Sequence, residues 1–495
     1  MTEAAPHTTS TATTASNLPA GARPSTVAGQ PPMAVYEWHD TLTPAVGWIA
    51  IEDDPRLPPV GGGGLFVSPS TTEAEVVDVA RSMARKLRVT CAAGTVRGAK
   101  GGVRYDPSAS DVNDVVGRFM SAHAAVIRDA WATGADLNTD HAVLDALAQT
   151  HVGIPHCLYA LAQRHPDARP ETLLGGTVVA AHPASDGAPD APSPRLAIAE
   201  AAVGYGVARA LAALTDHHQE GGNETPTPLR GLDVAVQGFG TVGSTFALYA
   251  RALGARIVAI ADRDHFVVHP DGIDVHALVA RRQKFTPSGS ARLVDCFGGA
   301  SDDEDEGDKG DRMSLSLTTR GADEDGDVWL TRFLNACDGG VDVFAPCAQR
   351  YVMTPSATDA LAAAIARRRR HSSIGAPTRA YVASGANNIA RDPAAFREFL
   401  DRNNVWTVPE WVSNAGTACL FMQAATLPPG GESFEDALIE VGDRVARFVA
   451  RALALHQCTT SAGAATPSTL LDACHAVADD ALCGTTHATS SDRPA

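Results

Sequence analysis

A glycine-rich turn is the first feature of the sequence whose spacing could do chemistry. The stretch "LDVAVQGFGTVGSTFAL" sets three glycines in the pattern G-x-G-x-x-G, after an apolar run typical of a strand and before a helical pattern. In such a turn the first glycine permits a tight bend, the second lets the backbone approach a pyrophosphate, and the third brings strand and helix together. The pattern predicts a dinucleotide-binding turn made of Gly238, Phe239, Gly240, Thr241, Val242 and Gly243. A sheet of the same type that holds no ligand is the alternative.

The end of the next apolar run bears on the choice of dinucleotide. "ARIVAIADRD" reaches Asp262, whose carboxylate could accept hydrogen bonds from ribose hydroxyls. A carboxylate there would also repel a 2′-phosphate, so Asp262 favours NAD as the cofactor. Arg263 follows directly and could hold such a phosphate, so NADP is not excluded.

A single lysine among glycines is the second candidate. In "RGAKGGVRYDP", Lys100 is surrounded by Gly98, Gly101 and Gly102. Glycines leave room for a substrate beside the amine, and an amine removed from water can titrate near neutrality and act as a general base. A plain turn with the lysine in water is the alternative.

Several periodic stretches must position these residues. Short alternating runs between positions 35 and 67 predict strands. "TTEAEVVDVARSMARKLRV", which starts at position 71, predicts a helix that opens with a threonine cap. "LAIAEAAVGYGVARALAAL", which starts at position 196, predicts a helix that packs on two sides.

The composition narrows the class of protein. The chain has 495 residues, a net charge of -17 and a hydrophobic content of 44%. This length suggests two domains or more, and the acidic balance disfavours nucleic acid and anionic membranes as partners. No apolar run approaches the roughly 18 residues of a membrane span. The nine cysteines are scattered without a C-x-x-C pair, which indicates a reducing, cytoplasmic location.

Two local features, an adjacent histidine and cysteine and an acidic segment, could be either structural or functional. His156 and Cys157 are adjacent, but no matching pair of ligands accompanies them, so a packed cysteine is favoured and no metal site is predicted. Positions 302–327 hold eleven acidic and three basic residues, which predicts a disordered, solvated insertion. An acidic binding segment is the alternative there.

Six segments in order resemble the glutamate/leucine/phenylalanine/valine dehydrogenase family. "GAKGGVRYDP" resembles its catalytic-lysine motif, "GADLNTD" the segment that carries its catalytic aspartate, and "VAVQGFGTVG" its nucleotide loop. "VDVFAPCA", "VASGANN" and "VPEWVSNAG" resemble three later blocks that surround the nicotinamide. The early "GWIAIEDD" text is most similar to the leucine/phenylalanine/valine branch.

The resemblance implies a reversible oxidative deamination of an L-amino acid to a 2-oxo acid and ammonia. Lys100 would activate the water that attacks an iminium carbon, and Asp136 would carry protons to and from the substrate nitrogen. Asn387 would orient the substrate or the nicotinamide, and Cys347 and Ala348 would lie along the cofactor. A homo-oligomer is also implied. From the residues alone, Asp136 could instead cap a helix and Asn387 a loop.

The sequence departs from the family where the substrate would bind. The family has a second lysine that binds the substrate carboxylate. In a comparison without gaps, Val89 occupies the position of that lysine. Lys86 and Arg88 lie nearby, and either could bond a carboxylate, so both are predicted substrate-binding residues. Where the family usually has an arginine after paired glycines, this chain has Leu65 and Phe66.

The expected architecture is α/β with two domains that meet at the cleft where cofactor and substrate bind. The expected parts are a disordered tail (1–32), an open α/β substrate domain (33–192), a Rossmann-like dinucleotide domain (195–425) with a disordered insertion at about 286–328, helices that return to the first domain (430–485) and a second tail (486–495). The main hypothesis is an NAD(P)-dependent dehydrogenase of an apolar L-amino acid. A glutamate-type dehydrogenase and a catalytically impaired nucleotide-binding or regulatory protein are the alternatives.

Overall fold

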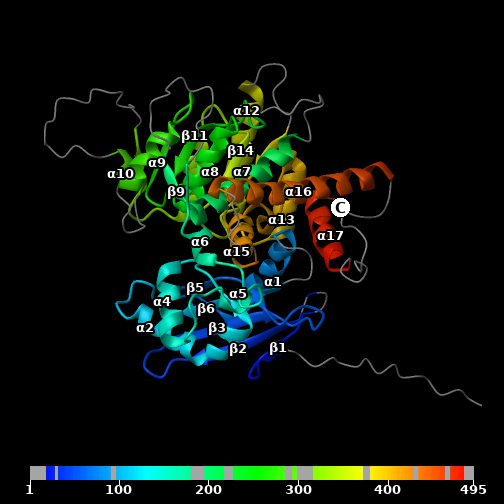
Figure 1. Cartoon of the computed structure of the whole chain (residues 1–495). Helices are drawn as coiled ribbons and strands as arrows, with labels where there is room; N and C mark the ends of the chain where they lie inside the picture. The colour runs from blue at the N-terminus through cyan, green and yellow to red at the C-terminus, as the bar shows by residue number, and fades with distance from the viewer. Residues whose placement is uncertain are drawn as a thin grey trace, which may run out of the picture. The chain divides into compact units, whose positions relative to one another are not determined.

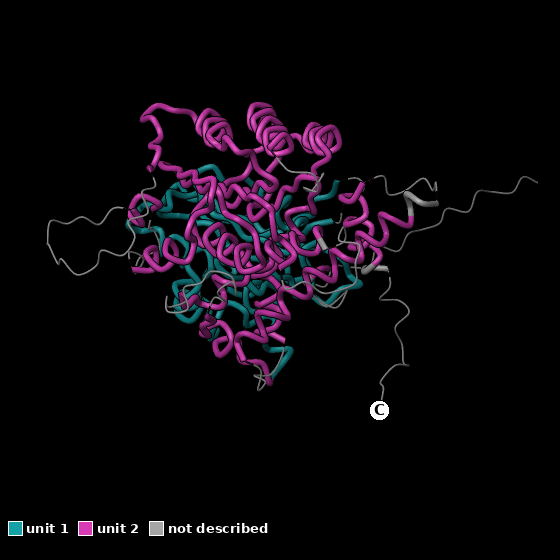
Figure 2. Tube along the Cα trace, turned by 90° about the horizontal axis from the view of Figure 1, so that it is seen from above, with its two compact units in different colours: residues 1–87, 91–166 teal, residues 88–90, 167–495 magenta. Residues whose placement is uncertain are grey.

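The computed structural model of the chain describes residues 18–27, 30, 32–90, 96–179, 194–216, 227–284, 292–297, 316–371, 379–426, 433–462 and 469–483. The chain divides into two compact units (Figure 2). Unit 1 comprises residues 1–87 and 91–166, and unit 2 comprises residues 88–90 and 167–495. Helices and strands alternate in both, as expected for an α/β protein (Figure 1).

Unit 1 is built on a sheet with the strand order β1-β2-β3-β6-β4-β7, in which β5 also pairs with β6. Its strands are β1 (Arg23–Ser25), β2 (Met33–His39), β3 (Val46–Glu52), β4 (Gly61–Gly62), β5 (Leu65–Val67), β6 (Arg97–Arg104) and β7 (Trp131–Ala132). Its helices are α1 (Glu73–Thr90), α2 (Val112–Ala122), α3 (Ala124–Asp129), α4 (His141–His151) and α5 (Tyr159–Ala162).

Strand β6 lies inside this sheet, antiparallel to β3 and parallel to β4 and β5. Because side chains alternate along a strand, the sheet supplies two separate apolar faces. Trp48 and Phe66 pack against α1, whereas Ile49 and Leu65 pack against α2 and α4. The start of α1 has the predicted cap, since Thr72 Oγ1 accepts a hydrogen bond of 3.3 Å from the backbone N–H of Glu75.

Unit 2 is built on a second sheet, with the order β13-β12-β11-β10-β14-β15-β16, and has a small hairpin of β8 and β9. Its strands are β8 (Thr177–Val179), β9 (Arg195–Ala197), β10 (Asp233–Gln237), β11 (Arg256–Ala261), β12 (His265–Val268), β13 (Thr318–Thr319), β14 (Val343–Pro346), β15 (Ala380–Val382) and β16 (Val405–Trp406). Its helices are α6 (Pro170–Leu174), α7 (Ile198–Asp216), α8 (Thr241–Ala252), α9 (Val275–Lys284), α10 (Leu293–Phe297), α11 (Gly326–Ala336), α12 (Pro355–His371), α13 (Pro393–Asn403), α14 (Glu410–Ser413), α15 (Gly416–Thr426), α16 (Phe434–Ala462) and α17 (Leu470–Cys483).

The strand order of unit 2 confirms the Rossmann-like prediction. Strands β11, β10, β14, β15 and β16 are parallel neighbours, and β12 joins the β11 edge antiparallel. This is the doubly wound order, with β12 in the place of the third parallel strand. The winding reverses between β10 and β14, so the carboxyl ends of these two strands mark the position of a ligand crevice.

Helix α7 runs through the core of unit 2, packed against α8, α14, α15 and α16. Glycine permits these close contacts, because a Cβ at Gly204 would lie 2.3 Å from the backbone N of Phe246 in α8. Among the described residues, one helical window, Ile198–Thr215 of α7, is apolar and long enough to cross a membrane, and 67% of it is buried within the protein. Burial on several sides accounts for its nearly continuous apolar sequence, as predicted.

The closing helices α16 and α17 are part of unit 2, whereas their resemblance to the family's last helices predicted that they return to the first domain. Helix α16 buries Val441, Val445 and Val449 in the core that surrounds α7. Helix α17 packs on α16, and Asp472 forms an ion pair of 2.8 Å with Arg397 of α13. These apolar stripes are therefore satisfied within unit 2.

Three expected boundaries differ from the structure. The expected tail at 1–32 includes β1, which pairs with β2, and the Tyr36 hydroxyl donates a 2.8 Å hydrogen bond to the Pro19 carbonyl. The expected disordered insertion at 286–328 includes α10, β13 and the start of α11, while 298–315 lie outside the described residues. Unit 1 ends at Pro166 instead of position 192. Composition missed these features because short elements form through backbone pairing and capping, which polar residues perform well.

Candidate functional site

Lys100 lies in the middle of β6 and not in a turn. Its backbone pairs with Ala50 of β3, and the residue is 3% exposed. None of Gly98, Gly101 and Gly102 has a positive φ, so the chain does not need these glycines for an unusual backbone conformation. The turn expected as the simpler alternative is therefore wrong.

Close packing is the reason for glycine at these positions. A Cβ at Gly98 would lie 2.3 Å from the backbone N of Ala84 in α1. A Cβ at Gly101 would lie 2.3 Å from the ring of Trp131, which is itself fully buried. The glycines thus let a helix and an indole ring pack directly onto the strand that carries the lysine.

Asp136 lies in an irregular segment after β7 that is fastened to β5. Thr139 Oγ1 donates a 2.8 Å hydrogen bond to the Leu65 carbonyl, and Asn138 Nδ2 donates one of 2.9 Å to the Val67 carbonyl. Asn138 has a φ of 61°, a conformation that asparagine tolerates well. These bonds fix the position of Asp136. Asn138 and Thr139 were not predicted as site residues, although both lie in the "GADLNTD" segment.

Asp136 does not cap the following helix. The N-cap of α4 is Asp140, whose side chain accepts a 3.0 Å hydrogen bond from the backbone N–H of Val143. The helix-cap alternative for Asp136 is therefore wrong.

Lys100 and Asp136 form a hydrogen-bonded ion pair, in which Lys100 Nζ donates to Asp136 Oδ2. Burial would raise the pKa of Asp136, but the charge and hydrogen bond of Lys100 outweigh it and hold the pKa below its usual value. The charge of Lys86 acts in the same direction. Asp136 is therefore an ionised carboxylate with two ammonium groups in its surroundings.

The structure separates the two candidate cations for the substrate carboxylate. Lys86 is 9% exposed and contributes to the electrostatic field at Asp136. Arg88 is grouped with unit 2, and its neighbour Val89 belongs to the apolar core of that unit. Leu65 is completely buried in the core of unit 1, so its side chain faces packing partners.

In unit 2 the glycine turn connects β10 to α8, as predicted. Gly238 has a φ of +103°, and a Cβ at Gly243 would lie 1.8 Å from the Gly238 carbonyl oxygen, so both positions need glycine for the turn itself. A Cβ at Gly240 would meet nothing within 4 Å. Gly240 is the N-cap of α8 and has no side chain that could bond the first N–H groups of the helix. The turn therefore presents open backbone at a helix N-terminus, which suits a phosphate.

The remaining predicted residues of the turn have different surroundings. Thr241 and Val242 open α8 and are partly exposed, whereas the Phe239 side chain is buried in the core, so Phe239 can reach a ligand through its backbone alone. Cys347 follows β14, and burial raises the pKa of its thiol to about 12. Ala348 is exposed beside Gly238. Cys347 and Ala348 thus adjoin the glycine turn as packing residues.

Asn387 lies in the loop after β15 and is held by Asn414, which was not among the predicted site residues. Asn414 Nδ2 donates a 2.8 Å hydrogen bond to Asn387 Oδ1. With its oxygen fixed in this way, Asn387 can present its amide N–H groups as donors. The signal for Asn414 was present, because this residue lies in the "VPEWVSNAG" block.

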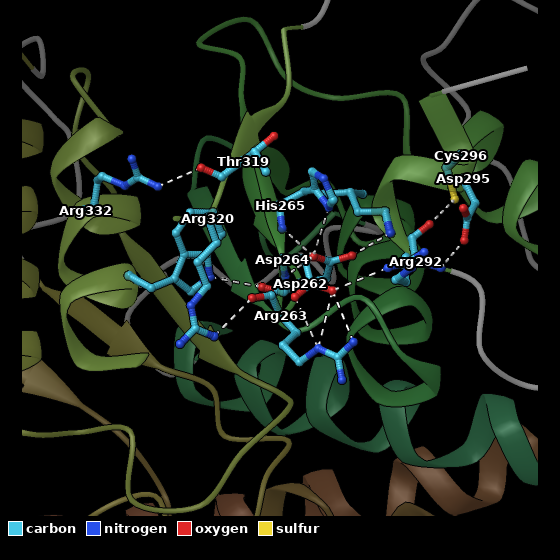
Figure 3. A network of polar contacts seen from close by, with 12 residues as sticks. Asp262, Arg263, Asp264, His265, Arg292, Asp295, Cys296, Thr319, Arg320 and Arg332 are labelled. Carbon is cyan, nitrogen blue, oxygen red and sulfur yellow. Dashed lines mark hydrogen bonds and ion pairs between the residues drawn. The ribbon is translucent and has the colours of Figure 1, made fainter. Parts of the chain in front are cut away.

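Asp262 lies at the carboxyl end of β11, at the centre of a polar network (Figure 3). Its Oδ1 accepts backbone hydrogen bonds from Asp264 at 2.8 Å and His265 at 2.7 Å, and its Oδ2 accepts one from Leu293 at 2.6 Å. The carboxylate therefore holds the β11–β12 turn and the start of α10. This structural task was not expected from the sequence.

The neighbouring Arg263 points to Asp264 (Figure 3), with an ion-pair distance of 3.2 Å. A pocket of about 220 Å³ opens here at the carboxyl ends of β10, β11 and β14. Its lining includes Gln237, Asp262, Arg263, Arg320 and Ala348. Its volume is below the roughly 300–1,000 Å³ of pockets that enclose most of a drug-sized ligand.

Residues 196–420 match the sequence model of the glutamate/leucine/phenylalanine/valine dehydrogenase family. The match runs from β9 into α15 of unit 2 and thus includes the glycine turn, Asp262, Cys347 and Asn387.

Curated relatives from this family are glutamate dehydrogenases. Glutamate dehydrogenase B of Halobacterium salinarum is 31% identical over 238 residues, 48% of each chain. The NADP-specific glutamate dehydrogenase of Saccharolobus shibatae is 26% identical over 219 residues, 43% of this chain and 44% of the relative. The NAD-specific enzyme of Staphylococcus aureus is 40% identical over 57 residues, 12% of this chain and 14% of the relative. The chain thus matches about half the length, or less, of these relatives.

Similarity of fold extends over nearly the whole chain. The leucine-bound, hetero-hexameric glutamate dehydrogenase of Thermus thermophilus superimposes with a TM-score of 0.57 at 20% identity, covering 92% of this chain and 88% of that one. At this identity the likeness concerns the fold alone.

Proposed function

We propose that the protein is an amino-acid dehydrogenase that oxidatively deaminates an L-amino acid to a 2-oxo acid and ammonia with a nicotinamide dinucleotide. The observation that carries the proposal is the ion pair between the buried Lys100 and the partly buried Asp136 in unit 1, within a chain whose unit 2 has a glycine turn of the dinucleotide-binding type. Acid–base catalysis requires positioned groups that can accept and donate protons, and a lysine beside an aspartate provides two of them.

The two residues would divide the proton transfers. Asp136, ionised because of its low pKa, accepts a proton from the substrate nitrogen and returns one to the leaving ammonia. Lys100, when unprotonated, takes a proton from the water that attacks the iminium carbon. The nicotinamide supplies the acceptor for the hydride that leaves the α-carbon.

Lys86 is the better candidate for the substrate carboxylate. It is a buried cation of unit 1 whose charge reaches Asp136, whereas Arg88 lies among residues grouped with unit 2. A carboxylate bound by Lys86 would set the α-amino group near Asp136. A Lys86→Gln variant should raise KM at least tenfold and change kcat less, because the lost interaction is made in both ground and transition states.

The glycine turn fits the pyrophosphate of the cofactor. The open space over Gly240 and the uncapped start of α8 are the features that phosphate binding requires. NAD was expected because of Asp262, but the three backbone hydrogen bonds of its carboxylate compete with ribose hydroxyls for the same lone pairs. Asp262 therefore does not decide between NAD and NADP.

Two substrate classes have support. The early segment that resembles the leucine/phenylalanine/valine branch favours an apolar L-amino acid, which is our first candidate. The curated relatives named above are glutamate dehydrogenases, which makes glutamate the second candidate.

The deciding experiment is the reduction of NAD and NADP at alkaline pH with a panel of L-amino acids, followed by absorbance. We expect turnover with one class of amino acid and a loss of at least about a thousandfold in Lys100→Met and Asp136→Asn. Arg230→Gln, a variant of an exposed arginine before β10, serves as the control and should keep full activity. Ammonium and the matching 2-oxo acid should drive the reverse reaction.

A nucleotide-binding protein without turnover is the competing function. It would bind the dinucleotide and gain thermal stability but reduce neither cofactor with any amino acid. The expected homo-oligomer stays a prediction, and light scattering of the purified chain would test it.

A further inference from the structure

We propose that Asn414, at the end of α14, is a positioning residue for the dehydrogenase reaction. It fixes the side-chain amide of Asn387 in the one orientation that leaves the two amide N–H groups of Asn387 to donate to an oxygen of the bound reactants. The inference rests on the proposed function, because it needs reactants that bind beside Asn387.

The backbone on both sides of Asn387 is held in place. The backbone N–H of Gly385 donates a 2.9 Å hydrogen bond to the Pro346 carbonyl at the end of β14. The backbone N–H of Asn388 donates a 3.0 Å hydrogen bond to Glu410 Oε1 of α14. The orientation of the Asn387 amide is a separate matter, because a half-turn of this amide exchanges its oxygen for its nitrogen.

The carbonyl of Gly385 decides the orientation of both amides. Asn414 Nδ2 donates to this carbonyl at 3.3 Å and to Asn387 Oδ1 at 2.8 Å. A backbone carbonyl only accepts hydrogen bonds, so Asn414 must turn its nitrogen toward it. The two hydrogens of that nitrogen then serve the carbonyl and Asn387, which must present its oxygen. The nitrogen of Asn387, with two donors, therefore lies on the side away from Asn414.

Burial separates the roles of the two asparagines. Asn414 is 6% exposed, and its Oδ1 has no hydrogen-bond partner among the described residues. A buried acceptor without a donor costs stability, so an apolar side chain of the same size would serve packing better. The useful part of Asn414 is thus its donor. Asn387 is partly exposed, so its N–H groups can meet a ligand.

The loop that carries Asn387 adjoins the glycine turn. A Cβ at Gly385 would lie 2.6 Å from Val242 Cγ1 at the start of α8 and 2.8 Å from Cys347 Sγ after β14. The loop therefore lies at the carboxyl ends of the strands, where ligands of such sheets bind. Two reactants carry a suitable acceptor oxygen, the amino acid in its carboxylate and the nicotinamide in its carboxamide.

The main test is a double-variant cycle on the full chain. Asn387→Ala should lower kcat/KM by about 10- to 100-fold, and Asn414→Leu by about tenfold. In the Asn387→Ala background, Asn414→Leu should change kcat/KM by less than about twofold, because no amide is left to orient. A rise in KM for the dinucleotide would place the acceptor on the nicotinamide, and a rise in KM for the amino acid would place it on the carboxylate.

A second variant tests the donor itself. Asn414→Asp keeps the shape of the side chain, but an ionised carboxylate cannot donate to Asn387, whereas a protonated one can. The kcat/KM of Asn414→Asp relative to the parent should therefore recover as the pH falls from about 9 to about 6, since burial raises the pKa of the new carboxyl. Taking the ratio to the parent cancels the titration of the catalytic groups and of Glu410. The ratio for Asn414→Leu should stay constant, and a constant ratio for Asn414→Asp would contradict the donor role.

Asn403→Leu is the matched control. Asn403 Nδ2 also donates to a backbone carbonyl, that of Phe399 at 2.9 Å, but it lies at the end of α13, before the amino end of β16. This variant should keep the kcat/KM of the parent. Thermal melts at both pH values show which variants are folded, and Asn414→Asp takes the place of Asn414→Leu in the cycle if the latter does not fold.

Full activity of Asn414→Leu, or an equal loss with and without Asn387, would overturn the inference while the active parent leaves the dehydrogenase proposal standing. A parent chain without turnover would overturn both.

Discussion

Two glycine-rich segments of this chain have similar compositions and opposite surroundings. In β6, the space beside Gly98 and Gly101 is filled by a helix backbone and an indole ring. At the turn in unit 2, Gly238 has a positive φ and the space beside Gly240 is empty. Crowded glycines serve packing, and an open glycine leaves room for a ligand. The comparison predicts that substitutions in the first segment impair folding and that a substitution at Gly240 impairs binding.

The largest effect is expected at Gly98. In Gly98→Ala the new methyl group would lie 2.3 Å from the backbone N of Ala84, and a helix backbone cannot yield as a side chain can. We expect a loss of more than about 3 kcal/mol in the free energy of unfolding, measured by urea denaturation. A loss below about 1 kcal/mol would contradict the close packing of α1 on β6.

Gly101→Ala should cost less, because its new methyl group meets the side chain of Trp131 at 2.3 Å. We expect a loss of about 1–3 kcal/mol in the free energy of unfolding. Combined with Trp131→Leu, the substitution should be less harmful than the sum of the two single changes, since the smaller side chain vacates the space. Strict additivity in this double-variant cycle would show that the ring is not the obstacle.

Gly240→Ala should leave stability nearly unchanged, because its φ of -75° suits alanine and the Cβ would meet no atom within 4 Å. Affinity for the dinucleotide should nevertheless fall about tenfold or more, since the methyl group would occupy the place of the pyrophosphate. Calorimetric titration with 5′-ADP and a thermal melt measure the two quantities. An unchanged affinity would show that Gly240 is not needed to leave room for the dinucleotide.

The smallest expected effect is the pH dependence of stability. It reports on the Lys100–Asp136 ion pair and not on the glycines beside Lys100. Because the pKa of Asp136 is below its usual value of about 3.9, the unfolded chain binds more protons than the folded one as the pH falls toward that range. The stabilisation from the pair is thus complete above about pH 5 and is lost as the pH falls through the folded value. Urea denaturation at pH 6 and pH 3.5 should show a larger drop for the parent than for Asp136→Asn. Equal drops would mean that the ion pair does not stabilise unit 1.

The sequence predicted the parts of the fold that follow from long periodic segments and local motifs. The strand order of unit 2, helix α7 and the cap at Thr72 are examples. The sequence placed Lys100 in a glycine-rich motif but did not show whether this motif forms a turn or a strand. The reason is that Ala84 and Trp131, which pack against the glycines, belong to other segments of the chain. Glycine-rich composition favours a turn at Lys100, but pairing and packing within the sheet make this segment a strand.

The site shows the same limit at Asp262 and Asn387. Each was found by its place in a motif, but one hydrogen bond of each comes from a residue distant in the sequence, Leu293 for Asp262 and Asn414 for Asn387. Motif spacing identifies which residues can reach a ligand. Which of their atoms are already engaged depends on the tertiary structure.

Strand β1 has a consequence for how the protein is handled. It covers the first three residues of β2, at the outer edge of the sheet that carries Lys100. A short edge strand of this kind blocks the pairing of its neighbour with a second chain. Removing the residues before Met33 would therefore expose an unpaired edge, and the shortened protein would be expected to aggregate before it lost the Lys100–Asp136 pair.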